Sequence, residues 1–319
     1  MDDMDMNAQD EQPSAATENG ENTVTEDQIG TRFGVILLGA PGTGKTTFCN
    51  ALQEFLSEVV ERPHCIINLD PANDNMKYQC DIDVKDLIDL NDVMRAKDDP
   101  EEPGLGLGPN GGMIYCIQFL EENIDWLIQQ ILQKQCRYFL IDMPGQVELF
   151  TNHPSLRNII KKLHQSVGLQ CCATHLVDCS YLMDCNKYLS AVTLSMCAKI
   201  GFEDVPLINI VSKLDLLQKL GRPQMNLIDL ENIAGIHYLF WDGEDDDPNS
   251  KPSFNKKYGK LSKSLCELIE TYMSHEGYLL LDITSRELIC YIIGKIDRAN
   301  GYFEQPEKVK NPKEAAFYQ

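Results

Sequence analysis

Short apolar runs alternate with segments of helical periodicity along most of the chain. Runs of this length without a polar face are typical of strands that are buried on both sides of a sheet. They span 33–38, 65–70, 137–142, 174–178, 206–211 and 278–283. Helices are expected at 46–60, 118–134, 186–200 and 285–299, and the stripe in 118–134 consists of Leu120, Ile124, Leu127, Ile128 and Ile131. This alternation predicts an α/β fold with a mostly parallel sheet that helices cover on both faces.

The two ends of the chain and one long stretch depart from this pattern. Residues 1–30 contain nine acidic residues, no Lys or Arg and almost no bulky apolar residue, which predicts a disordered acidic tail. The stretch 216–275 lies between two predicted strands and is too long for one crossover helix, so we expect a helical insertion there. With 305–319 interpreted as a C-terminal tail, the folded domain is expected to span 31–304.

The net charge of the chain argues against two classes of binding partner. The chain has 319 residues, and 49 Asp and Glu against 28 Lys and Arg give a formal net charge of −21. Such an acid excess argues against a general nucleic-acid binder and against docking on an anionic membrane. No apolar run reaches the ~18 residues of a membrane helix, and the N-terminus lacks the basic and apolar regions of a secretory signal. We therefore expect no direct contact with nucleic acid and no membrane association.

The twelve cysteines form no CxxC pair. Without a secretory signal, they are expected to be thiols in a reducing compartment, which indicates the cytoplasm. Cys171, Cys172, Cys179 and Cys185 cluster with His175, but their spacing does not suggest the ligand geometry of a metal site. Residues 171–179 (CCATHLVDC) also resemble a buried strand, in which small buried cysteines are common. We therefore favour structural packing of these side chains over a metal site.

A glycine-rich motif follows the first predicted strand and opens the first predicted helix. Gly39-Ala-Pro-Gly-Thr-Gly44-Lys45-Thr46 matches the phosphate-loop pattern G-x-x-x-x-G-K-[ST] in the context that this pattern requires. Glycines let backbone N–H groups wrap closely around phosphate oxygens at a helix N-terminus. Lys45 is expected to reach the β- and γ-phosphates, and the Thr46 hydroxyl to bind Mg²⁺. The residues expected to surround the nucleotide phosphates are Gly39, Pro41, Gly42, Thr43, Gly44, Lys45, Thr46 and Thr47.

Two further motifs end later strands. Asp142 ends the run at 137–142, where a carboxylate holds Mg²⁺ in phosphate-loop enzymes, usually through water. It is followed by Met-Pro-Gly145-Gln146, in which Gly145 would let the backbone approach the γ-phosphate and Gln146 would orient the attacking water.

Ser212-Lys213-Leu214-Asp215 ends the run at 206–211 and matches the guanine-recognition pattern [N/T/S]-K-x-D. The Asp215 carboxylate would accept hydrogen bonds from N1–H and the exocyclic amine of guanine, a donor pair that adenine lacks. The aliphatic stem of Lys213 would stack over the base. Four residues are weak evidence alone, because the same pattern also occurs at solvated helix starts.

Two further segments stand out: Gly108-Pro109-Asn110-Gly111-Gly112, and INLDPAND, which contains Asp70. Together with the phosphate loop, the Asp142 motif and the guanine-recognition pattern, they resemble the motifs of the GPN-loop GTPases. The resemblance covers roughly 32–304 and is closest to the second paralogue type. It implies a P-loop GTPase fold and a dimer in which Asn110 contacts the γ-phosphate or water of the partner's nucleotide. Asp70 would then lie near Mg²⁺ and the attacking water, as a group that orients water or accepts its proton. Ser212 stands where Ras-like GTPases usually have Asn, and the base loop at 281–284 has no clear S-A-K pattern.

The resemblance also implies a biological role, which nothing in the composition indicates. The chain would act in RNA polymerase II assembly and nuclear delivery, as a homodimer or a heterodimer with sister GPN-loop proteins, and would pass between cytoplasm and nucleus. The expected ligands are GTP or GDP and Mg²⁺, with Lys45, Asp70, Asn110 and Gln146 at the reacting end and Thr46 and Asp142 on the metal. Two alternatives stay open: an ATP-dependent P-loop kinase or ATPase, and a scaffold that binds GTP without hydrolysing it.

Overall fold

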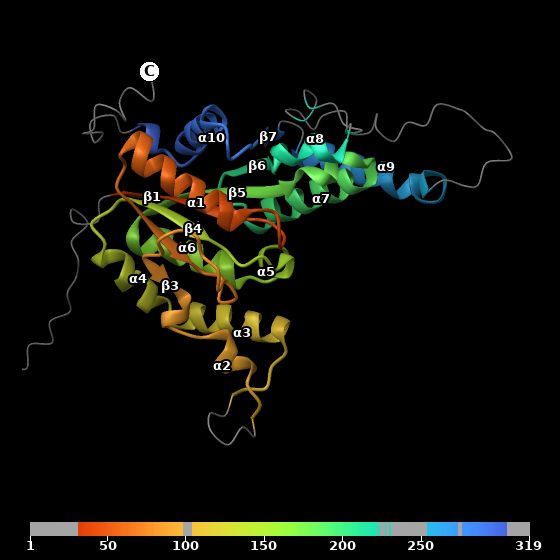
Figure 1. Ribbon diagram of the computed structural model, residues 1–319. Helices are drawn as coiled ribbons and strands as arrows, with labels where there is room; N and C mark the ends of the chain where they lie inside the picture. The colour runs from red at the N-terminus through yellow and green to blue at the C-terminus, as the bar shows by residue number, and fades with distance from the viewer. Residues whose placement is uncertain are drawn as a thin grey trace, which may run out of the picture. The chain divides into compact units, whose positions relative to one another are not determined.

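Parallel strands form one sheet in the part of the chain that the structure describes, which is 31–97, 104–221, 254–273 and 276–304, together with 223, 227 and 230. The structure is a computed structural model, and its strand order is β3-β2-β4-β1-β5-β6-β7 (Figure 1). Every neighbouring pair of strands runs parallel. The strands are β1 Arg32–Leu38, β2 His64–Asn68, β3 Ile82–Asp83, β4 Tyr138–Asp142, β5 Leu169–Asp178, β6 Leu207–Ser212 and β7 Tyr278–Leu280. The predicted fold class is thereby confirmed.

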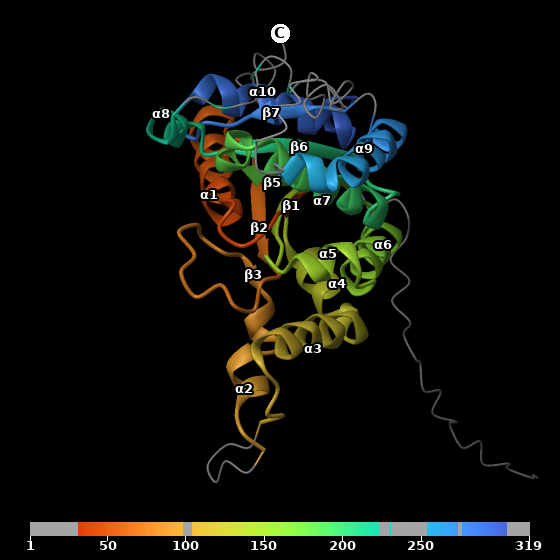
Figure 2. The same ribbon diagram turned by 90° about the vertical axis from the view of Figure 1, so that its right-hand side faces the viewer.

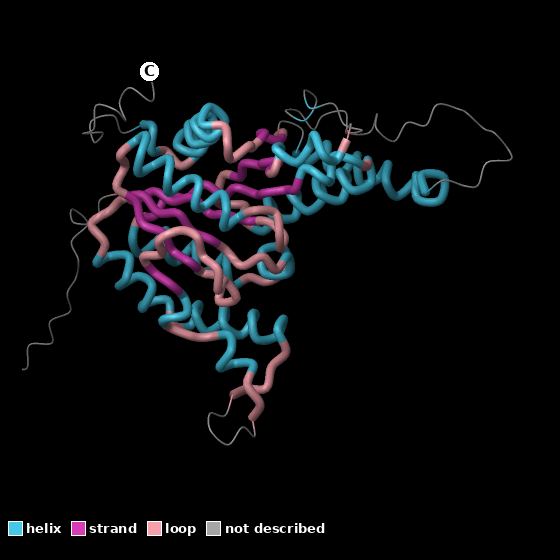
Figure 3. Tube along the Cα trace, viewed as in Figure 1, coloured by secondary structure: helices cyan, strands magenta, loops and turns pink. Residues whose placement is uncertain are grey.

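Helices cover both faces of this sheet, as Figure 3 shows for the strands and the helices around them. The α-helices are α1 Lys45–Phe55, α2 Leu90–Met94, α3 Pro109–Glu122, α4 Ile124–Gln133, α5 Val147–Thr151, α6 Ser155–Val167, α7 Cys185–Gly201, α8 Leu217–Leu220, α9 Phe254–Met273 and α10 Arg286–Ala299. A π-turn, η2 Leu56–Val60, follows α1, and short 3₁₀ turns are η3 Val84–Asp86, η4 Cys179–Met183, η5 Leu214–Leu216 and η8 Tyr302–Glu304. None of the described helices is long and apolar enough to cross a membrane.

Alternate residues of the central strand β1 face two different cores. Val35 and Leu37 pack with the apolar faces of α1 and α10, whereas Ile36 and Leu38 pack with those of α3, α4 and α6. Figure 1 accordingly shows α1 and α10 on one side of the sheet and α4 and α6 on the other. Burial on both faces explains why the strands are continuous apolar runs in the sequence.

Several predicted elements differ from the observed ones. The expected single helix at 118–134 is two helices, α3 and α4, because the backbone turns at Asn123, whose side-chain Nδ2 donates to the carbonyl oxygen of Phe119 at 2.8 Å. Strand β5 begins at Leu169, five residues before the predicted run at 174–178, because it pairs with the whole of β1. The two-residue strand β3 was not predicted.

The prediction that all cysteines are thiols is wrong for one pair. Cys65 on β2 and Cys136 before β4 form a disulfide, with their Cα atoms 6.5 Å apart. The sequence gives no sign of it, because the two residues are 71 positions apart and meet only when β2 pairs with β4. Cys171, Cys172 and Cys179 are free and buried. No group of three or more His, Cys, Asp or Glu among the described residues is arranged to hold a metal ion.

Parts of the predicted insertion at 216–275 are helical, namely α8 and α9. The rest of that stretch lies mostly outside the described residues, as do the predicted tails at 1–30 and 305–319. These domain boundaries therefore stay predictions. Because all strands are parallel, their carboxyl ends gather at one edge of the sheet, where ligands bind in open α/β folds. Leu38, Asp142 and Ser212 end their strands at that edge.

Candidate functional site

The phosphate loop connects the end of β1 to the start of α1. Gly44 caps α1 with φ 97°, and Gly39 has φ 147°, so both adopt backbone conformations that favour glycine. A Cβ atom at Gly39 would also come within 2.7 Å of the carbonyl oxygen of Leu176. The loop therefore needs glycine for its path and presents the backbone N–H groups of a helix N-terminus to an anion.

Lys45 is buried within this loop. Its Nζ donates to the carbonyl oxygen of Gly39 at 3.0 Å. Burial lowers the pKa of Lys45, while the nearby Asp142 and Asp70 charges act in the opposite direction. A phosphate oxygen is a stronger acceptor than a carbonyl, so a bound nucleotide would draw this ammonium from the loop carbonyl to the phosphates.

Thr46 and Asp142, the two residues predicted to hold Mg²⁺, are hydrogen-bonded to each other. The Thr46 hydroxyl donates to Asp142 Oδ2 at 3.0 Å, although the two residues are 96 positions apart. Burial raises the pKa of Asp142 to about 6, and hydrogen bonds from Tyr78 and Thr46 oppose that shift. Its other oxygen, Oδ1, is buried and has no hydrogen-bond partner in the described structure. An unpartnered carboxylate oxygen beside a threonine hydroxyl fits Mg²⁺ or one of its water ligands, because Mg²⁺ prefers oxygen.

Asp70 lies just beyond β2, and its Oδ1 accepts from the backbone N–H of Ala72 at 3.0 Å. Burial raises the pKa of Asp70, whereas hydrogen bonds from the backbone of Ala72 and Gly145 and the charge of Lys45 lower it. The backbone at Gly145 passes close to Lys45, since a Cβ atom at Gly145 would lie 3.0 Å from Lys45 Nζ. The structure thus brings Asp70 and Gly145 close to Lys45.

Gly108, Pro109 and Asn110 open a helix rather than a simple turn. Gly108 is the N-cap of α3 and Pro109 its first residue, a favoured position for proline. Asn110 Oδ1 accepts from Gln146 Nε2 of the same chain at 3.2 Å. Figures 1 and 2 show α3 beside α2, on the side of the sheet that carries β3. Two residues predicted for the reacting end of the nucleotide therefore lie together within one subunit.

The predicted base-recognition segment is fastened to the phosphate loop. The buried Ser212 hydroxyl donates to the carbonyl oxygen of Thr43 at 2.6 Å. Lys213 has φ 60° and pairs through Nζ with Asp178 Oδ2 at 2.7 Å. Its Cε lies 3.9 Å from where a Cβ of Gly44 would be, so its aliphatic stem passes over the loop. Asp215 is exposed and free to meet a base.

The base loop that lacks the S-A-K pattern still lies beside this segment. The backbone N–H of Leu214 donates to the carbonyl oxygen of Leu281 at 3.3 Å. Asp282 Oδ1 accepts from the backbone N–H and the hydroxyl of Thr284, at 2.8 and 2.7 Å. Local hydrogen bonds of this kind hold the turn without the usual motif.

The remaining predicted residues of the phosphate loop differ in their exposure to solvent. Thr43 is buried and its hydroxyl donates to the carbonyl oxygen of Ala40 at 2.9 Å. Pro41, Gly42 and Thr47 are exposed at the loop surface.

Three site residues were missed by the sequence analysis: Asn73, Tyr78 and Asp178. Asn73 and Tyr78 approach Asp142 from the loop between β2 and β3, and Asp178 pairs with Lys213. Asp178 ends a strand at the same edge as Asp142 and Ser212, and that position is a signal that could have identified it. No local pattern marks Asn73 or Tyr78.

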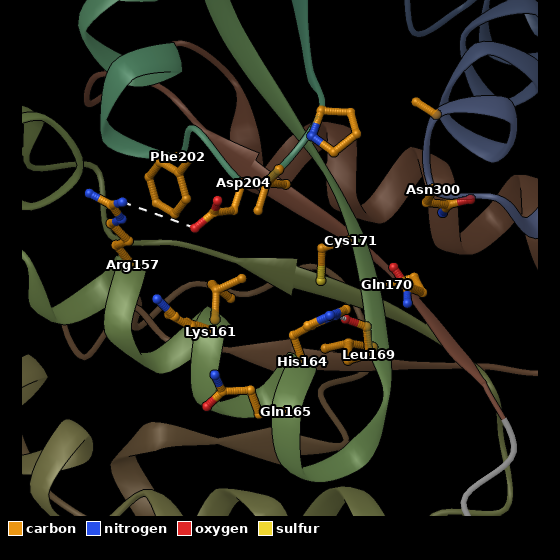
Figure 4. A pocket seen from close by; sticks show the side chains of 14 residues that line it. Arg157, Lys161, His164, Gln165, Leu169, Gln170, Cys171, Phe202, Asp204 and Asn300 are labelled. Atoms are coloured by element: carbon orange, nitrogen blue, oxygen red, sulfur yellow. Dashed lines mark hydrogen bonds and ion pairs between the residues drawn. The ribbon is translucent and has the colours of Figure 1, made fainter.

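A cavity of about 400 Å³ lies elsewhere. Its lining includes Leu169 and Pro206, which lie at the amino ends of β5 and β6, so it occupies the edge of the sheet opposite the phosphate loop. Figure 4 shows its polar side chains, with Arg157 directed to Asp204 at 4.0 Å. Lys161 is exposed to solvent. The cavity therefore takes no part in the nucleotide site.

Comparison with known proteins adds to this geometry. A family model described as "Conserved hypothetical ATP binding protein" matches residues 37–302. A protein named GPN-loop GTPase QQT1 from Arabidopsis thaliana is 40% identical over 272 residues, which cover 85% of each chain. GPN-loop GTPase 2 of Danio rerio is 37% identical over 88% of this chain and 84% of its own. A solved structure of a GTPase in apo form from Pyrococcus abyssi superposes with a TM-score of 0.64 over 84% of this chain and 97% of that one, at 21% identity, and supports the fold alone.

Proposed function

Because the chain belongs to the GPN-loop GTPase family, we propose that it binds GTP and hydrolyses it to GDP and phosphate. The hydrogen bond from Ser212 to Thr43 is the observation that supports this most directly. It joins the segment suited to guanine to the loop suited to phosphate, so that one ligand would contact both.

Guanine specificity would come from Asp215. Its carboxylate accepts two hydrogen bonds from the N1–H and the 2-amino group of guanine, whereas adenine presents an unprotonated N1 and no 2-amino group. Discrimination against adenine would be large, because a bound adenine would cover the Asp215 carboxylate and leave it without a hydrogen-bond donor. Lys213, held by Asp178, would support the base with its stem.

At the phosphate end, catalysis would rest on positioning and charge. Thr46 and Asp142 would hold Mg²⁺, which when bound neutralises charge on the β- and γ-phosphate oxygens. Lys45 would supply a second positive charge to the same oxygens. Gln146 and Asp70 would orient the attacking water, and the backbone at Gly145 would approach the γ-phosphate.

We further propose that the chain works as a dimeric switch, as a homodimer or with a sister GPN-loop protein. Asn110 is exposed at the start of α3 and is therefore available to a second subunit. In this arrangement it would contact the γ-phosphate or water of the partner's nucleotide, and GTP and GDP would favour different dimer shapes. The rate of hydrolysis per subunit would then rise with protein concentration until the dimer is complete. A rate that stays flat in a range where the chain is shown to change from monomer to dimer would contradict this.

The role proposed for the switch is assembly of RNA polymerase II and its delivery to the nucleus, with passage of the chain between cytoplasm and nucleus. The support is family resemblance, together with exposed apolar residues on α9 (Leu261, Leu268 and Tyr272) that suit contact with a protein client. Depletion of the chain should leave labelled RNA polymerase II subunits in the cytoplasm. An unchanged nuclear signal would contradict this role.

The enzymatic proposal is tested by phosphate release from GTP and from ATP. We expect turnover of GTP alone, and loss of both turnover and nucleotide binding in Lys45→Ala. The exposed Lys161→Ala serves as the matched control and should behave as the wild type. Equal use of ATP would favour the alternative of an ATP-dependent P-loop kinase or ATPase. Tight GTP binding without release of phosphate would favour a scaffold.

A further inference from the structure

Tyr78 approaches the predicted magnesium site from a loop that carries no nucleotide-binding motif. Its side chain is 5% exposed, and its hydroxyl donates to Asp142 Oδ2 at 2.9 Å. The same oxygen accepts from Thr46 at 3.0 Å and lies 3.4 Å from Asn73 Nδ2. Asp142 Oδ2 is thus fully engaged by protein donors, whereas Oδ1 of the same carboxylate is buried and unpartnered in the described structure.

The ring of Tyr78 is held firmly enough to fix the position of its hydroxyl. It packs in the core that contains Phe48 and Leu52 of α1. The next residue, Gln79, is joined to Gln53 of α1 by two hydrogen bonds, at 3.0 and 3.2 Å. A side chain locked by packing on one side and by its backbone on the other is well suited to orient a carboxylate.

The geometry points to Tyr78 as a positioning residue for the metal, an inference that rests on the proposed GTPase function. By occupying Oδ2 together with Thr46, the Tyr78 hydroxyl fixes the carboxylate of Asp142 and reserves Oδ1 for Mg²⁺ or its water ligand. The hydrogen bond also ties the loop after Asp70 to the strand that ends in Asp142. Metal binding and the placement of Asp70 are therefore coupled through Tyr78.

If the Tyr78 hydroxyl had only a structural role, its removal would lower stability and leave metal binding unchanged. Tyr278 provides the comparison, since it is another buried tyrosine whose hydroxyl is hydrogen-bonded, to Ser195 at 2.7 Å, and it lies on β7 away from the phosphate loop. Tyr78→Phe and Tyr278→Phe each remove one buried hydroxyl and keep the ring. Loss of stability is expected from both, but loss of metal-dependent nucleotide binding only from Tyr78→Phe.

The experiment measures binding of a fluorescent GDP analogue to the full chain, in EDTA and across a Mg²⁺ titration. Removal of a residue that orients a metal ligand lowers metal affinity by about 10-fold or more. We expect Tyr78→Phe to need roughly 10-fold more Mg²⁺ for half of the magnesium-dependent gain in affinity, with its affinity in EDTA within about twofold of wild type. Tyr278→Phe should match the wild type in both conditions.

Three outcomes would overturn the inference. An unchanged Mg²⁺ midpoint in Tyr78→Phe would do so, as would an equal change in Tyr278→Phe, because either result assigns the hydroxyl a structural role only. A wild-type chain that binds no guanine nucleotide would overturn the proposed function as well, and so is distinct from the first two. Melting temperatures of both variants, measured without nucleotide, establish that each is folded.

Discussion

The hydroxyl of Ser212 donates a 2.6 Å hydrogen bond to the backbone carbonyl of Thr43, 169 residues earlier in the chain. The bond is buried and connects the carboxyl end of β6 to the turn before α1. The carbonyl oxygen of Val177 lies 3.2 Å from the same hydroxyl oxygen and can only share its single proton. One small side chain thereby fixes the spacing between the residues suited to guanine and those suited to phosphate.

Ser212→Ala should therefore weaken nucleotide binding without unfolding the chain. The substitution leaves the Thr43 carbonyl without its buried donor, which costs about 1–3 kcal/mol. Where this cost falls on the nucleotide-bound state, GDP affinity should drop by up to roughly 150-fold, measured by equilibrium titration. Ser190→Ala is the control, because the Ser190 hydroxyl donates only to the carbonyl of Asn186 on the exposed face of α7. An equal loss in both variants would contradict the role given to Ser212.

Asn110→Ala should slow hydrolysis and leave GDP affinity nearly unchanged, because the side chain is exposed and bonds only to Gln146 among the described residues. Loss of one group that positions water or the γ-phosphate is expected to lower kcat by about 10-fold or more. The measurement is single-turnover phosphate release at saturating GTP.

Mixing Asn110→Ala with Lys45→Ala then distinguishes the two arrangements. If Asn110 acts on the partner's nucleotide, as proposed, a mixed dimer contains one site with both Lys45 and Asn110, and activity returns. If Asn110 acts through Gln146 of its own chain, no mixed dimer has a complete site and activity stays low. The second result would contradict the proposed exchange between subunits.

A buried ion pair between Arg62 and Asp297 joins the segment before β2 to α10. Two guanidinium nitrogens donate to the two carboxylate oxygens at 3.1 and 2.9 Å, and the guanidinium lies 4.6 and 4.1 Å from the ring centres of Tyr138 and Tyr302. Asp297→Ala should lower the free energy of unfolding by about 3–5 kcal/mol, because it removes the buried carboxylate that accepts from the Arg62 guanidinium and, at 2.7 Å, from the Tyr138 hydroxyl. Urea unfolding provides the measurement.

A double variant tests whether the loss of stability in Asp297→Ala comes from the Arg62 charge that remains. Arg62→Met with Asp297→Leu removes both charges and should recover part of the stability, because apolar pairs of similar volume often replace buried ion pairs at little cost. The recovery is incomplete because the Tyr138 hydroxyl, which donates to Asp297 Oδ1 at 2.7 Å, loses that acceptor. If the double variant were as unstable as Asp297→Ala, the loss would come from packing of α10 and from the Tyr138 hydroxyl, and not from the Arg62 charge.

His175 should make stability depend on pH. It is fully buried on β5, its Nδ1 lies 2.8 Å from Ser195 Oγ, and burial, with a smaller contribution from Lys45, lowers its pKa to about 4. The unfolded chain protonates His175 below about pH 6.5, whereas the folded chain does not until about pH 4, so its contribution to stability is complete above pH 6.5 and is lost as the pH falls. Asp142, whose pKa burial raises to about 6, has the opposite effect on stability. The folded chain binds a proton at Asp142 before the unfolded chain does, so this residue adds stability as the pH falls below 6. A comparison of variants is therefore needed.

His175→Gln cannot titrate and keeps the Asp142 effect. The difference in unfolding free energy between wild type and this variant should shrink by about 2 kcal/mol between pH 7 and pH 5, because one pKa unit corresponds to about 1.4 kcal/mol. Urea unfolding at the two pH values gives the difference. A difference independent of pH would show that His175 does not remain neutral in the folded chain.

The strands and the phosphate loop could be predicted from the sequence because their signals are local. A buried strand is a continuous apolar run, and the loop from Gly39 to Thr46 has a fixed spacing of glycines before a helix. The helix break at Asn123 could not be predicted, because an apolar stripe continues through it and one side-chain hydrogen bond decides the outcome. The bond from Tyr78 to Asp142 joins residues 64 positions apart, and Cys65 meets Cys136 across 71 positions, so both become visible only in the folded sheet.

The most direct test of the central claim, that this chain hydrolyses GTP at the site described, is a change of base specificity in Asp215→Asn. The asparagine amide would accept from N1–H and donate to the 2-oxo group of xanthine, which replaces the amine of guanine. Phosphate release from GTP and from xanthosine triphosphate should therefore exchange, with GTP turnover falling roughly 100-fold or more and the xanthine nucleotide becoming a substrate. If Asp215→Asn released phosphate from GTP at the wild-type rate and none from the xanthine nucleotide, the base would not be recognised by Asp215 and the account would be wrong.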